Sequence, residues 1–270
     1  MKLVLCVKRD LHGCILLNHL LPVLAGHEIQ ILMSDKTRPA EQDVPALGEL
    51  AYLERGLPCD RLFPLLDRLP DQGEWATFEG LAARHGVRFE TVDDINTPAR
   101  VASLAAFAPD LIVSARFSHI FRPPAIATAR HGVINIHPGE LPLYAGLFAP
   151  MRTIAEGGDA LACTIHWMDA GIDSGPVIAL AHLPYRRDAG LLEQIAALYP
   201  LSIPVVLDLL ERLGRGERIA SRPQDASRRR YRSMPDAGEV AAFLAAGHRF
   251  WTPQAYDALL ARFMPRQKAV

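Results

Sequence analysis

The chain has 270 residues, half of them hydrophobic by type, with 29 basic and 30 acidic residues and a formal net charge of -1. This length permits one large domain or one domain with a smaller appendage, and the charge balance argues against a broad nucleic-acid-binding surface. The four cysteines, Cys6, Cys14, Cys59 and Cys163, lack the spacing of a zinc site or a disulfide framework. The N-terminal apolar run is too short for a signal peptide, and no segment reaches the roughly 18 apolar residues of a membrane span, so we predict a soluble cytoplasmic protein.

The N-terminal part of the chain alternates between strand and helix patterns. Residues 3–7 predict a buried strand, Asp10 is a candidate cap for a helix that ends near Gly26, and residues 29–33 predict a second strand. This order favours a doubly wound α/β fold with a mostly parallel sheet. Only Gly13 follows the first strand, without the Gly-x-Gly-x-x-Gly pattern, which argues against a dinucleotide-binding site.

The next stretch, about residues 34–74, contains five prolines and predicts a helix only over 44–55. We interpret it as an insertion that shapes an acceptor pocket, forms an oligomer contact or simply caps the fold. Helix patterns then cover 74–85 and the residues from Pro98 to 108, and strand patterns cover 87–92 and 110–114. The last of these is apolar throughout, as expected for a central strand.

A short apolar run over residues 132–137 ends at Pro138 and Gly139, which is typical of a buried strand that enters a loop. Strand alternation puts Asn135 and His137 on the same face at its carboxyl end. An amide can donate to a developing oxyanion, and an imidazole can donate a proton or accept one, so the pair suits acyl transfer. An isolated Asn-x-His is nevertheless more often structural than catalytic.

Residues 161–178 predict two apolar strands joined by a loop that contains Asp169, Gly171, Asp173 and Gly175. The glycines permit positive φ angles and close backbone approach, so this loop is able to bend a carboxylate toward the end of the preceding strand. Asp173 is the candidate that orients His137.

These two stretches together resemble the folate-dependent formyltransferase family. The matching residues are Asn135-Ile-His137-Pro138, Leu141-Pro142-x-Tyr144-x-Gly146 and Asp169-x-Gly171-x-Asp173-Ser-Gly175-Pro176, within a resemblance over about residues 85–215. The family implies transfer of a formyl group from 10-formyltetrahydrofolate to an amine, without a metal, by a catalytic triad of Asn135, His137 and Asp173. The sequence departs from the family at Gly139, where Ser is common, and at Ala145, where Arg is common.

The resemblance also suggests where the donor binds. The segment after the strand over 110–114 and the Asp173 loop are expected to line the pterin pocket, and the candidates are Phe117, His119, Ile120, Trp167, Met168, Asp169, Gly171 and Ile172. Gly139 and Tyr144 lie beside the triad in sequence and are candidates for acceptor binding. Core packing is an equally good explanation for the aromatic residue at 117 and the aliphatic one at 120.

Apolar periodicity over residues 188–213 predicts a long helix on the sheet, kinked or split at Pro200 and Pro204. We therefore divide the chain into a catalytic domain, residues 1–215, and a small C-terminal extension, residues 216–270, with short helices over 237–246 and 253–263. The extension begins with an Arg run, residues 228–232, which invites a phosphate or nucleotide-sugar hypothesis but is more typical of a solvated charged face.

The resemblance leaves the acceptor open. The C-terminal extension is short for the barrel with which tRNA-formylating members grip tRNA, so nucleic acid is an unlikely partner. We expect a small-molecule amine or hydroxylamine, with N-hydroxyornithine slightly favoured over a nucleotide-linked amino sugar because no second nucleotide-binding module is apparent. Alternatives are a formyltetrahydrofolate hydrolase and a catalytically silent folate-binding protein. A homo-oligomer is possible, with Trp75 and Trp251 as candidates for its contact surface.

Overall fold

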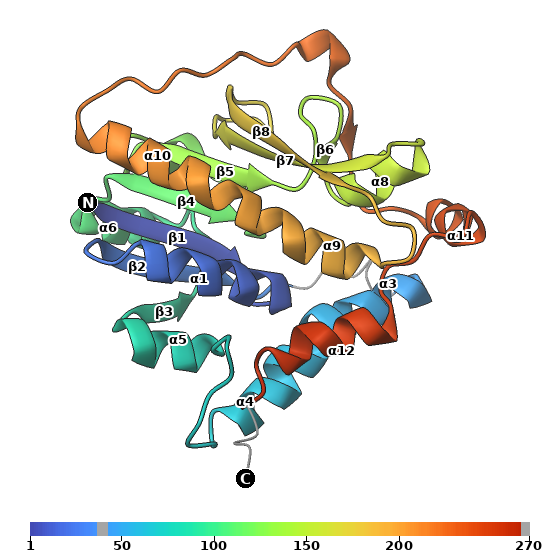
Figure 1. Cartoon of the computed structure of the whole chain (residues 1–270). Coiled ribbons are helices and arrows are strands. Elements are labelled where there is room, and N and C mark those ends of the chain that lie inside the picture. The colour runs from blue at the N-terminus through green and yellow to red at the C-terminus, as the bar shows by residue number, and fades with distance from the viewer. Residues whose placement is uncertain (37–42, 266–270) are drawn as a thin grey trace.

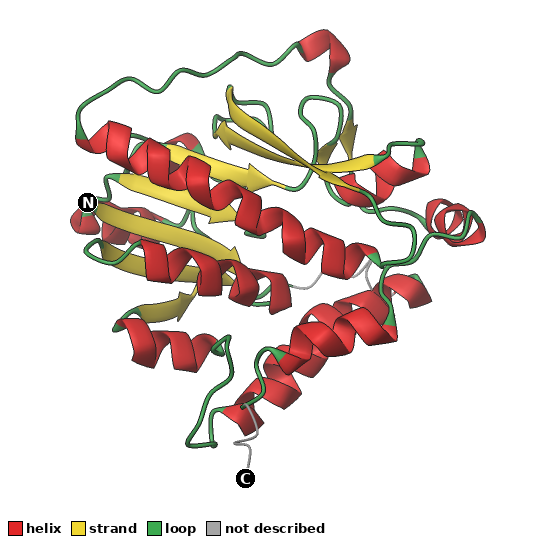
Figure 2. Cartoon of the chain, in the orientation of Figure 1, coloured by secondary structure: helices red, strands yellow, loops and turns green. Residues whose placement is uncertain are grey.

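The computed structural model describes residues 1–36 and 43–265 and has a seven-stranded sheet between two layers of helices (Figures 1 and 2). The strands are β1 (Lys2–Lys8), β2 (Glu28–Ser34), β3 (Arg88–Thr91), β4 (Leu111–Ala115), β5 (Val133–His137), β7 (Ala160–Trp167) and β8 (Val177–Pro184). Their order is β3-β2-β1-β4-β5-β7-β8. The first five strands of that order run parallel, and β7 and β8 form an antiparallel edge. The predicted doubly wound, mostly parallel sheet is confirmed.

Helices cover both faces of the sheet, as the alternation of side chains in β1 requires. On one face lie α1 (Leu11–Val23), α5 (Phe78–His85), α9 (Leu191–Leu198) and α10 (Ile203–Gly214), which share a core cluster with Leu3 and Leu5. On the other lie α6 (Pro98–Phe107) and α7 (Pro123–Ile126), packed with Val4 and Cys6. Neighbouring β1 residues therefore face different helix layers.

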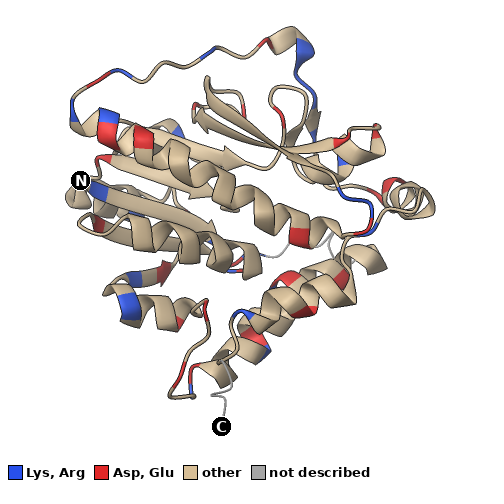
Figure 3. Ribbon diagram, in the orientation of Figure 1, with Lys and Arg blue, Asp and Glu red and all other residues tan. Residues whose placement is uncertain are grey.

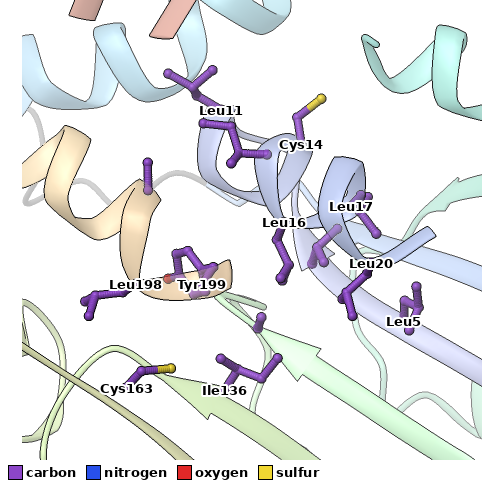
Figure 4. Close-up of a cluster of buried hydrophobic side chains, with 14 of the residues drawn as sticks. Leu5, Leu11, Cys14, Leu16, Leu17, Leu20, Ile136, Cys163, Leu198 and Tyr199 are labelled. Atoms are coloured by element: carbon purple, nitrogen blue, oxygen red, sulfur yellow. The ribbon is translucent and has the colours of Figure 1, made fainter. Parts of the chain in front are cut away.

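The larger core lies between β1, α1 and the turn η3 (Tyr199–Ser202) that joins α9 to α10. Figure 4 shows Leu198 beside Tyr199 and Leu16 of α1 on the side toward it, with Leu20 and Leu5 farther along the same cluster, and Tyr199 is fully buried. Asp10 begins α1 as predicted, because its carboxylate accepts the N–H of Gly13. The four cysteines are buried and unpaired.

The helical run Leu191–Gly214 corrects one expectation from the sequence. Within the part of the chain that the structure describes, it is the segment long and apolar enough to cross a membrane by length and composition, and we had expected none. Pro200 and Pro204 split it as predicted, because the run consists of α9, the 3-10 turn η3 and α10, and each proline lies in the first turn of a new segment. Its Leu192 and Leu209 side chains pack into the core, so we interpret the run as a sheet-covering helix.

The insertion is more helical than predicted. Instead of one helix over 44–55, a continuous run of turns covers α3 (Pro45–Ala51), the π-helical turns η1 (Tyr52–Gly56) and η2 (Pro58–Leu62), and α4 (Phe63–Leu66). Pro58 and Pro64 again occupy first-turn positions. The expected helix over 74–85 is shorter than predicted and begins at Phe78, because the Thr77 hydroxyl caps it by accepting from Gly80 N–H. Pro39 lies outside the described residues.

The tail returns to pack on this insertion. It contains η4 (Ala226–Arg228), β9 (Tyr231–Arg232), α11 (Ala237–Ala245) and α12 (Pro253–Ala261), and Figure 1 shows α12 alongside α3 and α4. The Tyr256 hydroxyl donates to the Leu53 carbonyl at 2.8 Å, and the Phe63 and Phe263 ring centroids are 4.9 Å apart. Trp75 is buried against Phe263, so within this chain it is a core residue and not a contact surface.

Candidate active site

The carboxyl ends of the parallel strands open onto a cavity of about 310 Å³. Strand order reverses between β1 and β4, which is where doubly wound folds bind their ligands. Asn135 and His137 from β5 and Asp173 from the β7–β8 loop all line this cavity. The remaining wall comes from the segment after β4, from the short helix α8 (Ala149–Ala155), from the insertion, from α9 and from the tail.

The three triad candidates lie within reach of one another. Asn135 Nδ2 is 3.4 Å from Asp173 Oδ1, and His137 Nδ1 is 3.7 Å from Asp173 Oδ2. The second distance is an ion-pair distance and too long for a hydrogen bond. A carboxylate oxygen thus faces each of the two β5 side chains, as their position on one face of the strand leads one to expect.

The orientation of His137 comes from the backbone as well as from the carboxylate. Its Nε2 is 2.7 Å from the Tyr144 carbonyl oxygen, and a carbonyl only accepts, so Nε2 carries the proton. In the neutral imidazole, Nδ1 then holds a lone pair on the side of Asp173. His137 is therefore arranged to take up a proton at Nδ1, and it becomes a donor there only once it is protonated.

A second histidine belongs to this cluster and was missed in the sequence. His166, on β7, is 1% exposed and pairs with Asn135 in the antiparallel register. Its Nδ1 donates to the Trp167 carbonyl at 2.8 Å, which leaves Nε2 to accept from Asn135 Nδ2 at 3.3 Å. Nε2 is also 3.7 Å from Asp173 Oδ1. In the sequence, strand alternation places His166 and Thr164 on one face of their strand. The sequence does not show which strand pairs with it, so the contact with Asn135 could not be predicted.

Asp173 is held in its ionised form. Burial alone would raise the pKa of its carboxyl group, but His137, His166 and the Gly146 N–H, which donates to Oδ2 at 2.8 Å, together place that pKa well below its usual range. Its backbone has a φ of 50°, the left-handed region that non-glycine residues seldom adopt. Such strain is often found at functional sites, and here it turns the carboxylate toward β5.

The donor-binding candidates divide into two groups. Six of them line the cavity: Phe117, His119, Ile120, Met168, Gly171 and Ile172. Trp167 and Asp169 do not, which corrects the expectation for both. Trp167 is partly buried against the core, and the Asp169 carboxylate turns back to accept from the Ser174 hydroxyl at 2.6 Å.

The two acceptor-binding candidates also lie outside the cavity wall. The Tyr144 hydroxyl donates to Glu156 on the surface, and only its carbonyl reaches the site, through His137. Gly139 is enclosed, because a Cβ built there would lie 2.6 Å from the Ala149 Cβ and 2.8 Å from His137 Nε2. The serine common in the family at this position would therefore collide with the imidazole.

The tail closes over the same loops. Strand β6 (Ala145–Gly146) pairs in parallel with β9, and the Ala145 side chain is buried beneath this pair. The N–H groups of Ala145 and Leu147 donate to the carbonyls of Arg230 and Arg232. A long arginine side chain at position 145 has no room under this contact, which accounts for the second departure from the family pattern.

Two tail side chains hold the Asp173 loop itself. Gln224 Nε2 donates to the carbonyls of Asp173 at 3.0 Å and of Gly175 at 2.7 Å, and Arg229 donates to the Ile172 carbonyl at 2.6 Å. Arg230 and Arg232 pair with Glu156. The interpretation of the Arg run as a solvated charged face is thus wrong for Arg229, which is bound to the loop, but it holds for Arg230, whose side chain is 60% exposed in a surface ion pair.

The described residues contain no cluster of three or more His, Cys, Asp or Glu side chains that could hold a metal ion. The polar groups that converge are instead an amide, two imidazoles and a carboxylate. Such a set can donate to an oxyanion, accept a proton and hold an imidazole in one tautomer, which are the requirements of acyl-group transfer.

Comparison with known proteins agrees with this chemistry. A formyl transferase family model matches residues 88–190. A methionyl-tRNA formyltransferase of Roseiflexus sp. (strain RS-1) is 36% identical over 147 residues, or 54% of this chain and 45% of the relative. The chain spans about half the length of the curated relatives that it matches.

Solved structures share the fold at low identity. A sugar N-formyltransferase from a Shewanella species has a TM-score of 0.57 at 17% identity and covers 91% of this chain and 88% of its own. An N-formyltransferase from Helicobacter canadensis, in complex with folinic acid and dTDP-3-aminofucose, has a TM-score of 0.53 at 14% identity, over 86% of this chain and 71% of its own. Residues 88–190 thus match a formyl transferase domain, and the sheet that contains them has the fold of the solved N-formyltransferases.

Proposed function

We propose that this protein transfers a formyl group from 10-formyltetrahydrofolate to the amine or hydroxylamine nitrogen of a small molecule. The observation that carries the proposal is the convergence of Asn135, His137 and Asp173 on the wall of one cavity at the carboxyl edge of the sheet. The six lining candidates from Phe117 to Ile172 supply apolar faces and backbone groups for the pterin ring of the donor. The complex of folinic acid with the Helicobacter enzyme supports this donor class.

In the proposed reaction, the donor supplies an activated formyl carbonyl. Asn135 donates an amide N–H to the oxygen of that carbonyl as negative charge develops there, and loss of one such donor typically costs on the order of 10²-fold in rate. His137 accepts the proton of the attacking nitrogen at Nδ1 while the Tyr144 carbonyl holds its Nε2–H. Asp173 stabilises the imidazolium that results, and this imidazolium returns the proton to the folate nitrogen as the bond from that nitrogen to the formyl carbon breaks.

The contacts that the C-terminal tail makes within the chain favour a small acceptor over tRNA. Residues 222–232 are fastened across the active-site loops, and α12 packs on the insertion, so these parts are engaged within the chain. In the view of Figure 3, Lys and Arg are interspersed with Asp and Glu along the described part of the chain. Of the small acceptors, N-hydroxyornithine is slightly preferred to a nucleotide-linked amino sugar. The tRNA relatives make initiator methionyl-tRNA the second acceptor to test.

The test measures tetrahydrofolate release from 10-formyltetrahydrofolate, first without acceptor and then with N-hydroxyornithine, ornithine, amino-sugar nucleotides or methionyl-tRNA. Release that depends on one small acceptor, and that falls at least about 10²-fold in Asn135→Ala, supports the proposal. Release without acceptor identifies a hydrolase instead. Donor binding without any turnover identifies a silent binding protein.

A further inference from the structure

The half of the cavity away from the donor candidates is mostly aliphatic. Leu47, Leu50 and Ala51 contribute from α3 of the insertion, and Leu191, Leu192 and Ile195 from α9. Phe250 of the tail lies beside them, 6.4 Å from the Phe148 ring centroid. Much of this wall therefore comes from the insertion and the tail, which lie outside the sheet.

The charges at this end of the cavity are compensated within the protein. Arg116, at the end of β4, donates from Nε and Nη2 to Asp10 Oδ2 at 3.0 and 2.8 Å and from Nη2 to Glu54 Oε2 at 2.8 Å. Asp10 is fully buried, and the Glu54 side chain is 13% exposed. Burial would raise the pKa of Glu54, but Arg116, His12 and Lys8 lower it below its usual range.

The formal charge balance at this end is therefore close to zero. Among the described residues that line the cavity, the cations other than histidine are Lys8 and Arg116, and the carboxylates are Glu54 and Asp173. The buried Asp10 adds a third negative charge behind Arg116. An incoming phosphate monoester carries nearly two negative charges and meets no net positive charge here.

At the N-termini of α1 and α9, N–H groups near this end already donate to protein oxygens. A helix N-terminus attracts phosphate because its N–H groups lack partners. In α1, the Gly13 N–H already donates to Asp10 Oδ1 at 2.8 Å. In α9, the N–H groups of Leu191 and Leu192 donate to the carbonyls of Arg249 and Phe250, so protein groups occupy the places that a phosphate would take.

We infer that the acceptor of this enzyme is a phosphate-free amine or hydroxylamine with an aliphatic body, which lies between α3 and α9 with its nitrogen toward His137. This inference rests on the proposed function and excludes from its acceptors the nucleotide-linked sugars, ribonucleotides and tRNA. Arg230 and Arg232 share the single carboxylate of Glu156, and neither side chain is among those that line the cavity.

The test compares acceptors with and without phosphate. Binding is measured by calorimetry with the full chain saturated with 5-formyltetrahydrofolate, so the result does not depend on turnover. The pairs are glycinamide ribonucleotide with glycinamide ribonucleoside, and a dTDP-linked amino sugar with the free amino sugar; N-hydroxyornithine and hexylhydroxylamine are added as phosphate-free aliphatic ligands. We expect the phosphate to weaken binding at least about tenfold in each pair, and at least one aliphatic ligand to bind more tightly than any phosphorylated one. Tighter binding of a phosphorylated member in either pair overturns the inference, whether or not formyl transfer occurs.

A charge variant tests whether charge compensation is the reason that phosphate is excluded. Glu54→Gln removes one of the two carboxylates from Arg116, and Glu49→Gln, at an exposed position of α3, is the matched control. With folding checked by circular dichroism and by 5-formyltetrahydrofolate binding, Glu54→Gln should tighten the binding of glycinamide ribonucleotide about tenfold and leave the ribonucleoside unchanged. An equal effect of both substitutions, or none with either, refutes charge compensation as the reason for excluding phosphate.

Discussion

The contact between Gln224 and the Asp173 loop offers the sharpest test of the role assigned to the tail. One side-chain amide donates to two carbonyls, those of Asp173 at 3.0 Å and Gly175 at 2.7 Å. A net contribution of about 1 kcal/mol for each hydrogen bond gives about 2 kcal/mol that favours the observed loop position. Because the loop also has the left-handed φ of Asp173, we expect it to relax when these bonds are removed.

A loss of about 2 kcal/mol changes the ratio of correctly to incorrectly placed loop roughly 30-fold. We therefore expect Gln224→Ala to lower kcat by up to about 30-fold, with a smaller change in the KM for 10-formyltetrahydrofolate, since Phe117, His119 and Ile120 follow β4 and do not lie on this loop. Gln224→Glu, which keeps the length but loses the donor, should behave like the alanine variant.

Steady-state kinetics with the preferred acceptor measures this effect, and thermal unfolding is recorded for each variant. Arg228→Ala is the control, because this exposed arginine lies in the same tail segment. A kcat within twofold of wild type for Gln224→Ala, combined with a lowered Tm, would show that the tail supports the fold without positioning Asp173.

Three further outcomes follow from individual contacts. Gly139→Ser should abolish most turnover while donor binding persists, because its Cβ would lie 2.8 Å from His137 Nε2; a kcat equal to wild type contradicts the crowding seen there. The lowered pKa of Asp173 contributes stability that is fully present above its unfolded-state pKa of about 4 and is lost as the pH falls through the lower folded-state value. Urea unfolding between about pH 2 and 6 should thus show a weaker pH dependence in Asp173→Asn, and identical slopes argue against it. Tyr256→Phe should lower stability by about 1 kcal/mol, or roughly 2 to 4 °C in Tm, through the bond it makes to the insertion, and an unchanged Tm would show that this bond contributes nothing.

The strands and the position of the triad were predictable because they depend on local patterns. Alternation places Asn135 and His137 on one face of β5, and the glycines around Asp173 permit the backbone turn that the structure contains. Asp10 was recognised as a helix cap for the same reason, since a cap depends only on residues within one turn.

The features that could not be predicted depend on contacts between distant parts of the chain. His166 meets Asn135 only through the antiparallel register of β5 and β7, which a single sequence does not specify. The prolines of the insertion suggested broken structure, but each described proline of the helical run occupies a first-turn position, and α12 packs against the run from about 200 residues away in sequence. The Arg run looked solvated because its partners, the Ile172 carbonyl and Glu156, lie in other elements.

These long-range contacts also explain why the chain departs from the family where it does. A tail that pairs with β6 needs a small residue at position 145, and a loop compressed between Ala149 and His137 needs glycine at position 139. The departure at position 145 therefore follows from the pairing of the tail with β6, and the departure at position 139 from the close packing of Ala149 and His137. Under the proposed function, the insertion and the tail contribute the part of the cavity wall that would contact the acceptor, so acceptor choice should change with substitutions in α3 and at Phe250 while the triad stays intact.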